Sequence, residues 1–116
     1  MILKTDSYKI THWRQYPRGT SNVYSYFESR GGEYNEIVFF GLQYFIKKYL
    51  MQPPTIANKI KAKIFTKFHL GSSDLFNEEG WDKLIALGYY PISIKAAPEG
   101  TVVNTQNVLM TIENTH

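Results

Sequence analysis

Hydrophobic residues in this chain repeat with two different spacings, and the chain changes from one spacing to the other along its length. Between residues 56 and 68 they recur at every fourth position, which predicts one face of an α-helix. In the last quarter, apolar and polar residues alternate over 91–96 and 108–113, which is typical of half-buried strands. Because both patterns occur and no internal repeat is present, we expect a mixed α+β fold.

Composition places the chain among single folded domains that contain no cysteine. It has 116 residues, 43% of them hydrophobic, and a chain of this size buries roughly 65% of the surface that its unfolded form exposes. The absence of cysteine excludes disulfide scaffolds, thiolate zinc sites and cysteine nucleophiles. The longest strongly apolar run covers only 37–42, and the N-terminus lacks a signal-peptide pattern. We therefore expect one domain over 1–116, no membrane association and a cytoplasmic location.

The charged residues are nearly balanced but unevenly distributed. Thirteen basic residues face ten acidic ones, for a net charge of +3, which does not favour nucleic acid as a partner. The 51–70 segment contains four lysines and no acid, whereas 71–90 contains four acids and one lysine. Lys59, Lys63 and Lys67 share one side of the expected helix, and we interpret them as a solvated face rather than a phosphate or nucleic-acid patch.

The first half of the chain predicts a helix, a strand and a second helix. Side-chain oxygens over 5–7 could cap a helix over 8–16, which Pro17 ends. The aromatic-rich segment 22–30 predicts a strand, and Gly31 and Gly32 follow it. Apolar residues at helical spacing predict a helix over 37–50.

The second half predicts two more helices and then strands. One helix covers 56–68, and another follows Asn77, its expected N-cap, and ends at Gly88. The alternating segments 91–96 and 108–113 are expected to pair with each other and with the aromatic strand. The expected architecture is thus a small sheet packed with three to four helices.

No catalytic motif is evident from residue types and spacing. The chain has no glycine-rich phosphate loop and no nucleophile elbow, and His12, His69 and His116 are not spaced as metal ligands. Tyr24 and Tyr26, with a cation at the strand end, could stack bases as a single-strand nucleic-acid binder does. Composition favours the alternative, in which these rings pack against a helix.

Two features point more specifically to ligand contact. At the start of the first helix, Asp6 and Tyr8 would place free amide donors beside an exposed ring, a combination suited to an anion next to a planar group. Arg30, between the aromatic strand and two glycines, is a cation at a rigid edge that could bind a phosphate with both guanidinium nitrogens.

Seven segments of the chain, in order, resemble the N-terminal region of the nicotinamide phosphoribosyltransferase family. They are 5–12 (TDSYKITH), 15–17 (QYP), 24–30 (YSYFESR), 40–44 (FGLQY), 76–81 (FNEEGW), 94–100 (IKAAPEG) and 107–115 (NVLMTIENT). They extend over nearly the whole chain, and seven ordered segments are far more specific than any single motif.

The resemblance implies an enzyme of NAD salvage. The family joins nicotinamide to C1 of phosphoribosyl pyrophosphate, releases pyrophosphate, forms nicotinamide mononucleotide and uses Mg²⁺. It also implies a homodimer with active sites at the subunit interface. There, by resemblance, Tyr8 stacks on nicotinamide in the partner's site, Arg30 contacts phosphate groups and Asp6 lies nearby. No catalytic residue and no metal ligand is expected within this segment.

The resemblance further implies that the family's catalytic α/β barrel is not part of these 116 residues. We expect the chain alone to lack transferase activity and to require a complementing catalytic domain. Two alternatives are kept: a non-enzymatic module that binds single-stranded nucleic acid, and a regulatory dimerisation module.

Overall fold

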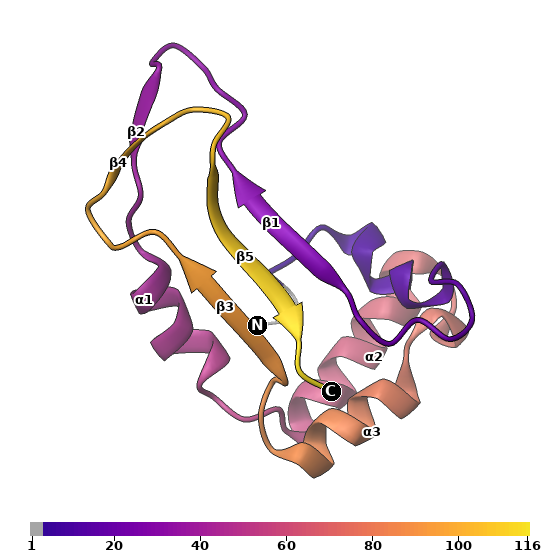
Figure 1. Cartoon of the computed structure of the whole chain (residues 1–116). Helices are drawn as coiled ribbons and strands as arrows, with labels where there is room; N and C mark the ends of the chain where they lie inside the picture. The colour runs from indigo at the N-terminus through magenta and orange to yellow at the C-terminus, as the bar shows by residue number, and fades with distance from the viewer. Residues whose placement is uncertain (1–3) are drawn as a thin grey trace. The chain divides into compact units, whose positions relative to one another are not determined.

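The computed structural model of the chain describes residues 4–116 and divides them into two compact units. The first, called here the helical unit, comprises Lys48–Tyr90 together with the N-terminal residues up to Thr20. The second, the sheet unit, comprises Ser21–Lys47 and Pro91–His116. Figure 1 shows α2 and α3 in the one and β1, β5 and β3 in the other. Each unit is therefore assembled from two separate stretches of chain.

The helical unit contains two α-helices and two short 3₁₀ helices. These are η1 (Ser7–Arg14), α2 (Ile56–Leu70), η3 (Ser73–Leu75) and α3 (Glu78–Leu87). The ends of α2 and α3 carry residues that stop or start a helix. Thr55 Oγ1 accepts from Asn58 N at 3.2 Å, and Gly71, with φ of 82°, ends α2.

The prediction for α3 is confirmed at both ends. Asn77 Oδ1 accepts from Gly80 N at 2.9 Å and caps the first turn, while Gly88 closes the last turn with φ of 76°. An added Cβ on Gly80 would lie 2.5 Å from Asn77 Nδ2, so the cap requires glycine there.

The helix predicted over 8–16 exists, but it is a 3₁₀ helix without the expected side-chain cap. The Asp6 side chain accepts no capping hydrogen bond. Its backbone oxygen accepts from Lys9 N at 3.0 Å, and its carboxylate forms an ion pair with Lys9 Nζ at 3.2 Å. The carboxylate therefore pairs with the nearby ammonium group instead of a backbone amide.

The core of the helical unit is small and aromatic. Ala62 on α2 is buried against Phe76 and Trp81, whose rings stack with centroids 6.0 Å apart, and Ile85 packs against this group. Thr66 is fully buried, and its hydroxyl donates to Ala62 O at 2.8 Å. The hydroxyl is thereby satisfied without a partner outside the helix.

The apolar spacing predicted α2 correctly, but the apolar stripe is not the side that packs. Its residues are largely exposed: Ile56 by 65%, Ile60 by 53%, Ile64 by 52% and Phe68 by 81%. The small residues Ala62 and Thr66 are buried instead. Small side chains allow a neighbouring helix to approach closely, which explains why this side is the one in contact.

The expected solvated lysine face is wrong for two of its three members. Lys59 Nζ lies 2.6 Å from Asp82 Oδ1 and 3.2 Å from Glu78 Oε1, and Lys63 Nζ lies 2.7 Å from Glu78 Oε2. Asp82 and then Glu78 raise the pKa of the Lys59 ammonium group, because both stabilise its charged form. The basic segment and the acidic segment after it thus pair with each other across α2 and α3.

The sheet unit contains a three-stranded antiparallel sheet in the order β1-β5-β3. Its strands are β1 (Tyr24–Glu28), β3 (Ile92–Ala96) and β5 (Val108–Asn114). Tyr26 pairs with Thr111 on one side of β5, and Ile94 pairs with Ile112 on the other. The predicted pairing of the three segments is confirmed, and Leu109 on the central strand is only 2% exposed.

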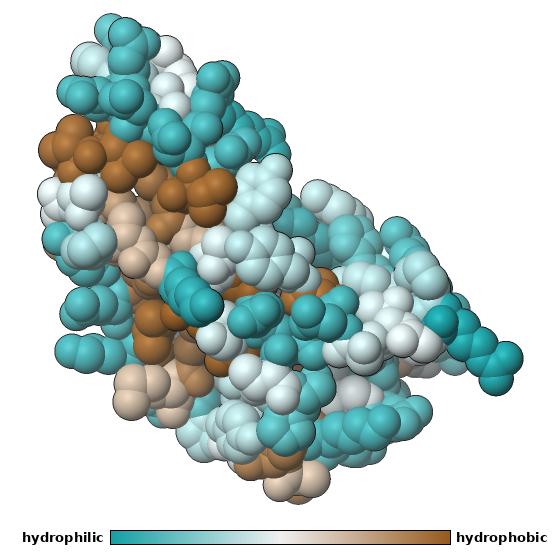
Figure 2. Space-filling model, in the orientation of Figure 1, coloured by the Kyte–Doolittle hydropathy of each residue, from teal (hydrophilic) through white to brown (hydrophobic). Residues whose placement is uncertain are grey.

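A second antiparallel pair and one helix complete the sheet unit. The pair is β2 (Glu36–Val38) with β4 (Val102–Asn104), and the helix is α1 (Leu42–Phe45). It continues as a π-helical segment, η2 (Ile46–Leu50), which leads into the helical unit at Lys48. Val38 and Val102 face each other in register, exposed by 60% and 58%. Figure 2 shows hydrophobic side chains gathered over this strand pair.

The prediction of one helix over 37–50 is wrong in its first third. Ile37 and Val38 form a strand, because β-branched residues fit the pairing with β4. Gly41 adopts φ of 101°, a left-handed conformation that no regular helix contains, so the helix begins only at Leu42.

Taken by class, the fold is mixed α+β with small antiparallel sheets, as predicted. Within residues 4–116 no closed barrel is formed. No helix in the described part of the chain is long and apolar enough to cross a membrane.

Candidate functional site

Tyr8 lies on η1 with its ring largely exposed. The side chain is 59% exposed, and its ring is tilted by 59° against that of His12, with centroids 5.3 Å apart. Its backbone oxygen accepts from Thr11 Oγ1 at 2.8 Å. The ring is therefore held on one side by the helix while the rest of its surface remains open to a planar ligand.

Asp6 lies directly before η1 and is exposed. Asp6 and Tyr8 thus lie two residues apart on one short segment. Because Asp6 forms an ion pair with Lys9, this end of η1 presents one acidic and one basic group within reach of the same ligand.

Arg30 belongs to the sheet unit and follows β1. Gln106 N donates to Ser29 O at 2.9 Å and fixes the chain just before Arg30, and Gly31 turns it away with φ of 94°. Arg30 is exposed, and within residues 4–116 its guanidinium forms no hydrogen bond or ion pair. All five donors of this cation are thus available to a phosphate group.

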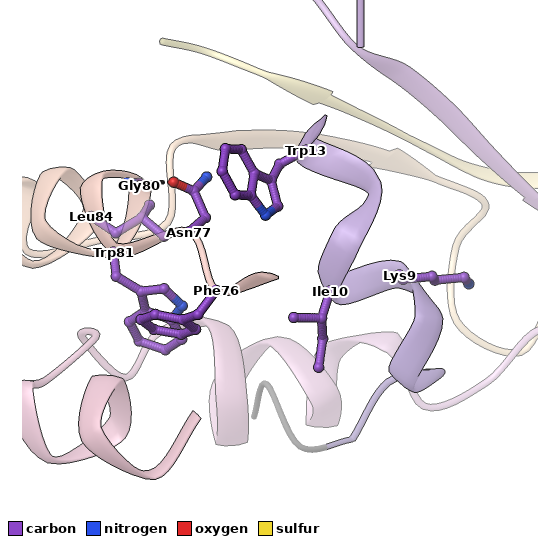
Figure 3. Close-up of a pocket in the computed structure, with 8 residues that line it drawn as sticks. All are labelled: Lys9, Ile10, Trp13, Phe76, Asn77, Gly80, Trp81 and Leu84. Atoms are coloured by element: carbon purple, nitrogen blue, oxygen red, sulfur yellow. Dashed lines mark hydrogen bonds between the residues drawn. The ribbon is translucent and has the colours of Figure 1, made fainter. Parts of the chain in front are cut away.

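A cavity of about 370 Å³ lies beside η1 within the helical unit. Figure 3 shows Ile10 pointing from η1 toward Phe76, while the end of Lys9 points away. The Trp13 indole nitrogen donates to Leu75 O at 3.1 Å and anchors η1 to the segment before α3. Sequence reasoning did not predict this cavity, because its two walls are more than 60 residues apart.

Glu99 is a second feature that sequence reasoning missed. Its carboxylate accepts from Gln43 N at 2.8 Å and from Gly41 N at 2.7 Å, so it caps α1 from a turn on another part of the chain. These backbone bonds, that of Gln43 first, hold the pKa of Glu99 below its usual value. The only sequence signal was that both segments, 40–44 and 94–100, carry the family resemblance.

The described part of the chain has no cluster of side chains that could bind a metal ion. Residues 4–116 contain no group of three or more His, Cys, Asp or Glu side chains placed to hold a metal ion. His12 contacts the Tyr8 ring and His69 stacks on Phe65, so each has an aromatic neighbour.

Comparison with known proteins agrees with the resemblance. A family model described as nicotinamide phosphoribosyltransferase, N-terminal domain, matches residues 1–94. The nicotinamide phosphoribosyltransferase of Xanthomonas campestris pv. campestris is 48% identical over 117 residues, which cover 99% of this chain and 24% of the relative. That of Acinetobacter baylyi is 35% identical over 128 residues, which cover 95% of this chain and 25% of the relative.

The family model that matches is that of the N-terminal domain. The chain spans about a quarter of the length of these two relatives. The match to the N-terminal domain model and the alignment with the Xanthomonas relative both include Asp6, Tyr8 and Arg30. The chain therefore belongs to the nicotinamide phosphoribosyltransferase family and matches its N-terminal domain.

Proposed function

We propose that this chain serves as the N-terminal domain of an enzyme that joins nicotinamide to phosphoribosyl pyrophosphate. The products would be nicotinamide mononucleotide and pyrophosphate, a step of NAD salvage. The 48% identity over nearly the whole chain supports this assignment. The exposed ring of Tyr8 is the observation that carries the role of this segment, because an aromatic ring left open to solvent is suited to stack on a flat base.

In this proposal Tyr8 positions nicotinamide in the active site of a partner subunit. Ribosyl transfer passes through an oxocarbenium-like state, in which the base must be held flat against C1 of the sugar. A stacked ring restrains the base without competing for its amide group. The proposal thus assigns the segment a binding role in a homodimer and no bond-making step.

Arg30 is proposed to contact phosphate groups of phosphoribosyl pyrophosphate. A guanidinium donates two parallel hydrogen bonds to one phosphate, which stabilises the charge that develops on the leaving pyrophosphate. Asp6 is the weaker candidate, since its carboxylate is paired with Lys9.

The Mg²⁺ that the family resemblance implies is not assigned ligands in this segment. Residues 4–116 offer no cluster of metal-binding side chains, so no step of the proposed reaction is routed through a metal held here. Mg²⁺ is expected to enter with phosphoribosyl pyrophosphate.

The roles of Tyr8 and Arg30 can be tested in a chimera. This segment would replace the matching N-terminal quarter of the Xanthomonas campestris enzyme. Tyr8→Ala is expected to raise the KM for nicotinamide at least tenfold and Tyr8→Phe much less, because phenylalanine keeps the ring. Arg30→Ala should raise the KM for phosphoribosyl pyrophosphate. An unchanged nicotinamide KM in the Tyr8→Ala chimera, or an inactive but folded parent chimera, would contradict the proposal.

The 116-residue chain alone is predicted to have no transferase activity. Mixing it with a separately produced catalytic domain should restore synthesis of nicotinamide mononucleotide. Turnover by the purified chain without that domain would contradict the proposal that the reaction requires the catalytic domain.

The alternative of a single-strand nucleic-acid binder has one observation in its favour. Tyr24 and Tyr26 are each 61% exposed on β1, so they do not pack against a helix. The lysines of α2 could supply a basic surface for such a binder, but Lys59 and Lys63 are paired with acids, which weakens this alternative. A salt-dependent affinity for oligothymidylate that Tyr26→Ala abolishes would favour it.

A further inference from the structure

The exposed face of α2 carries an apolar stripe that nothing in the described part of the helical unit covers. The stripe consists of Ile56, Ile60, Ile64 and Phe68, each more than half exposed. Large aliphatic and aromatic side chains in a continuous row are uncommon on the surface of a single domain and mark interaction sites. The row follows i, i+4 spacing, which is the ridge that one helix presents to the groove of another.

Exposed lysines lie along this stripe, and α2 itself contributes no acid to it. At about 100° per residue, the direction of Lys61 is next to that of Phe68, and the direction of Lys67 falls between those of Ile56 and Ile60, so both lysines are on the side of the helix that carries the stripe. Both lysines are exposed and neither has an ion pair within residues 4–116. The α2 segment, Ile56–Leu70, contains no Asp or Glu. The face therefore combines an apolar ridge with uncompensated positive charge.

The side of α2 that packs on α3 already has a partner of complementary chemistry. There α2 packs on α3 through Ala62 and Trp81, and Lys59 and Lys63 pair with Asp82 and Glu78 at 2.6 and 2.7 Å. An amphipathic helix with acids beside its apolar residues is thus the natural partner of α2. The exposed side of α2 also combines apolar residues with lysines, but its apolar residues are larger and its lysines are not paired with acids in the described chain.

We propose that the exposed face of α2 is a docking surface for an amphipathic helix of another protein, with acidic residues flanking its apolar side. This inference does not depend on the proposed transferase role.

A second copy of α2 fits the face less well, because it would bring lysine against lysine with no acid on either helix. An anionic lipid surface shares the charge of the proposed partner but offers no groove for the apolar ridge, and the vesicle measurement below distinguishes the two.

The probe for this proposal is a synthetic 18-residue helical peptide. It carries leucines at i, i+4 spacing on one side, glutamates on both flanks and a fluorescein label. A matched peptide has glutamine in place of every glutamate. Binding of each to the 116-residue chain is measured by fluorescence anisotropy at 50 and 300 mM NaCl.

Substitutions on exposed side chains separate the surface from the fold. The test variants are Ile60→Ser with Ile64→Ser, and Lys61→Gln with Lys67→Gln. Matched controls are Met51→Ser, an exposed apolar residue of the same unit, and Lys95→Gln, an exposed lysine of the sheet unit. Circular dichroism confirms that each variant keeps its helix content.

The expected result is saturable binding of the glutamate peptide that weakens at least tenfold in both test variants and at higher salt, and not in the controls. Absence of saturable binding to the folded chain would overturn the proposal. So would equal binding of the glutamine peptide, since charge would then have no role. Self-association of the chain that Ile60→Ser with Ile64→Ser removes would assign the face to a second copy. Binding to phosphatidylglycerol vesicles but not to the peptide would assign it to a membrane.

Discussion

The helical unit and the sheet unit are held together by contacts of different range. In the helical unit, α2, η3 and α3 follow one another along the chain, and the pairs that join them are 15 and 23 residues apart. In the sheet unit, β1 pairs with β5 and β2 with β4 across more than 60 residues. The contacts among α2, η3 and α3 are therefore of short range, whereas the contact of η1 with Leu75 and the pairing of β2 with β4 join residues more than 60 apart.

Single polar side chains join the two stretches of chain that form the sheet unit. The Asn114 side chain accepts from Val23 N at 2.6 Å and donates to Ser21 O at 2.9 Å, which joins the start of one stretch to the end of the other. The Glu99 carboxylate likewise joins distant segments, because it accepts from Gly41 N at the start of α1. These bonds combine a polar side chain with free backbone groups, so they stabilise the unit without a large apolar core.

The largest predicted effect concerns the core of the helical unit. Trp81→Ala removes a ring that is only 6% exposed and stacked on Phe76, and it should lower the free energy of unfolding by about 3–5 kcal/mol. Urea unfolding followed by circular dichroism measures the loss. Hydrogen exchange should accelerate in α2 and α3 more than in β5, whereas uniform acceleration would show that the two units unfold together.

Trp13→Phe is the matched control. Trp13 is 38% exposed and contributes one hydrogen bond to Leu75 O, so its substitution should cost no more than about 1.5 kcal/mol. A loss as large as that of Trp81→Ala would mean that η1 is part of the core.

A smaller effect is expected at the centre of the sheet. Leu109 on β5 is only 2% exposed, so Leu109→Ala should lower the free energy of unfolding by about 3 kcal/mol. Exchange should accelerate in β1, β3 and β5 first. Val108→Ala, at an exposed neighbouring position, serves as the control and should change the free energy of unfolding little. Equal effects of the two substitutions would contradict the assignment of Leu109 to the core.

A third prediction concerns the dependence of stability on pH through Glu99. Its folded pKa lies below the ordinary value of 4.5, so its contribution is complete above that pH and is lost as the pH falls through the folded pKa. Glu99→Gln should lower Tm by several degrees at pH 7. The difference from the parent should shrink below about pH 4.5. If the difference in Tm between the parent and Glu99→Gln stayed constant down to pH 2, the charge of the Glu99 carboxylate would not be the cause of the stabilisation.

The smallest predicted effect is that of the ion pairs between α2 and α3. Lys59→Gln should lower Tm slightly at low salt, because it removes contacts to Asp82 and Glu78. In 1 M NaCl the effect should disappear, since salt screens the pairs. Lys61→Gln removes a lysine without an ion pair in the described chain and should have no effect at either salt concentration.

The helical unit was largely predictable because its signals are local. Asn77 and Gly88 mark the ends of α3 by their own side-chain and backbone preferences. The lysine-rich and acidic segments lie close enough in sequence that their pairing could have been inferred. Which side of α2 packs could not, since the apolar spacing alone favoured the large residues over Ala62 and Thr66.

The candidate site was predictable only in part. The exposure of Tyr8 and of Arg30 follows from their places at a helix start and a strand end. Glu99 and the cavity beside η1 could not be predicted, because each depends on residues brought together from distant segments. The helix expected over 37–50 failed for the same reason: Ile37 and Val38 form a strand only because β4 is there to pair with them.

By itself, the sequence determined the family, the α+β class, the three paired strands and the two long helices, since each depends on residue order or on periodicity within a few turns. Tertiary structure alone decided that Glu99 caps α1, that η1 borders a cavity and that the apolar ridge of α2 faces outward. Those outcomes depend on which surfaces meet, and burial is set by the sum of contacts across the fold rather than by the hydrophobicity of any one segment.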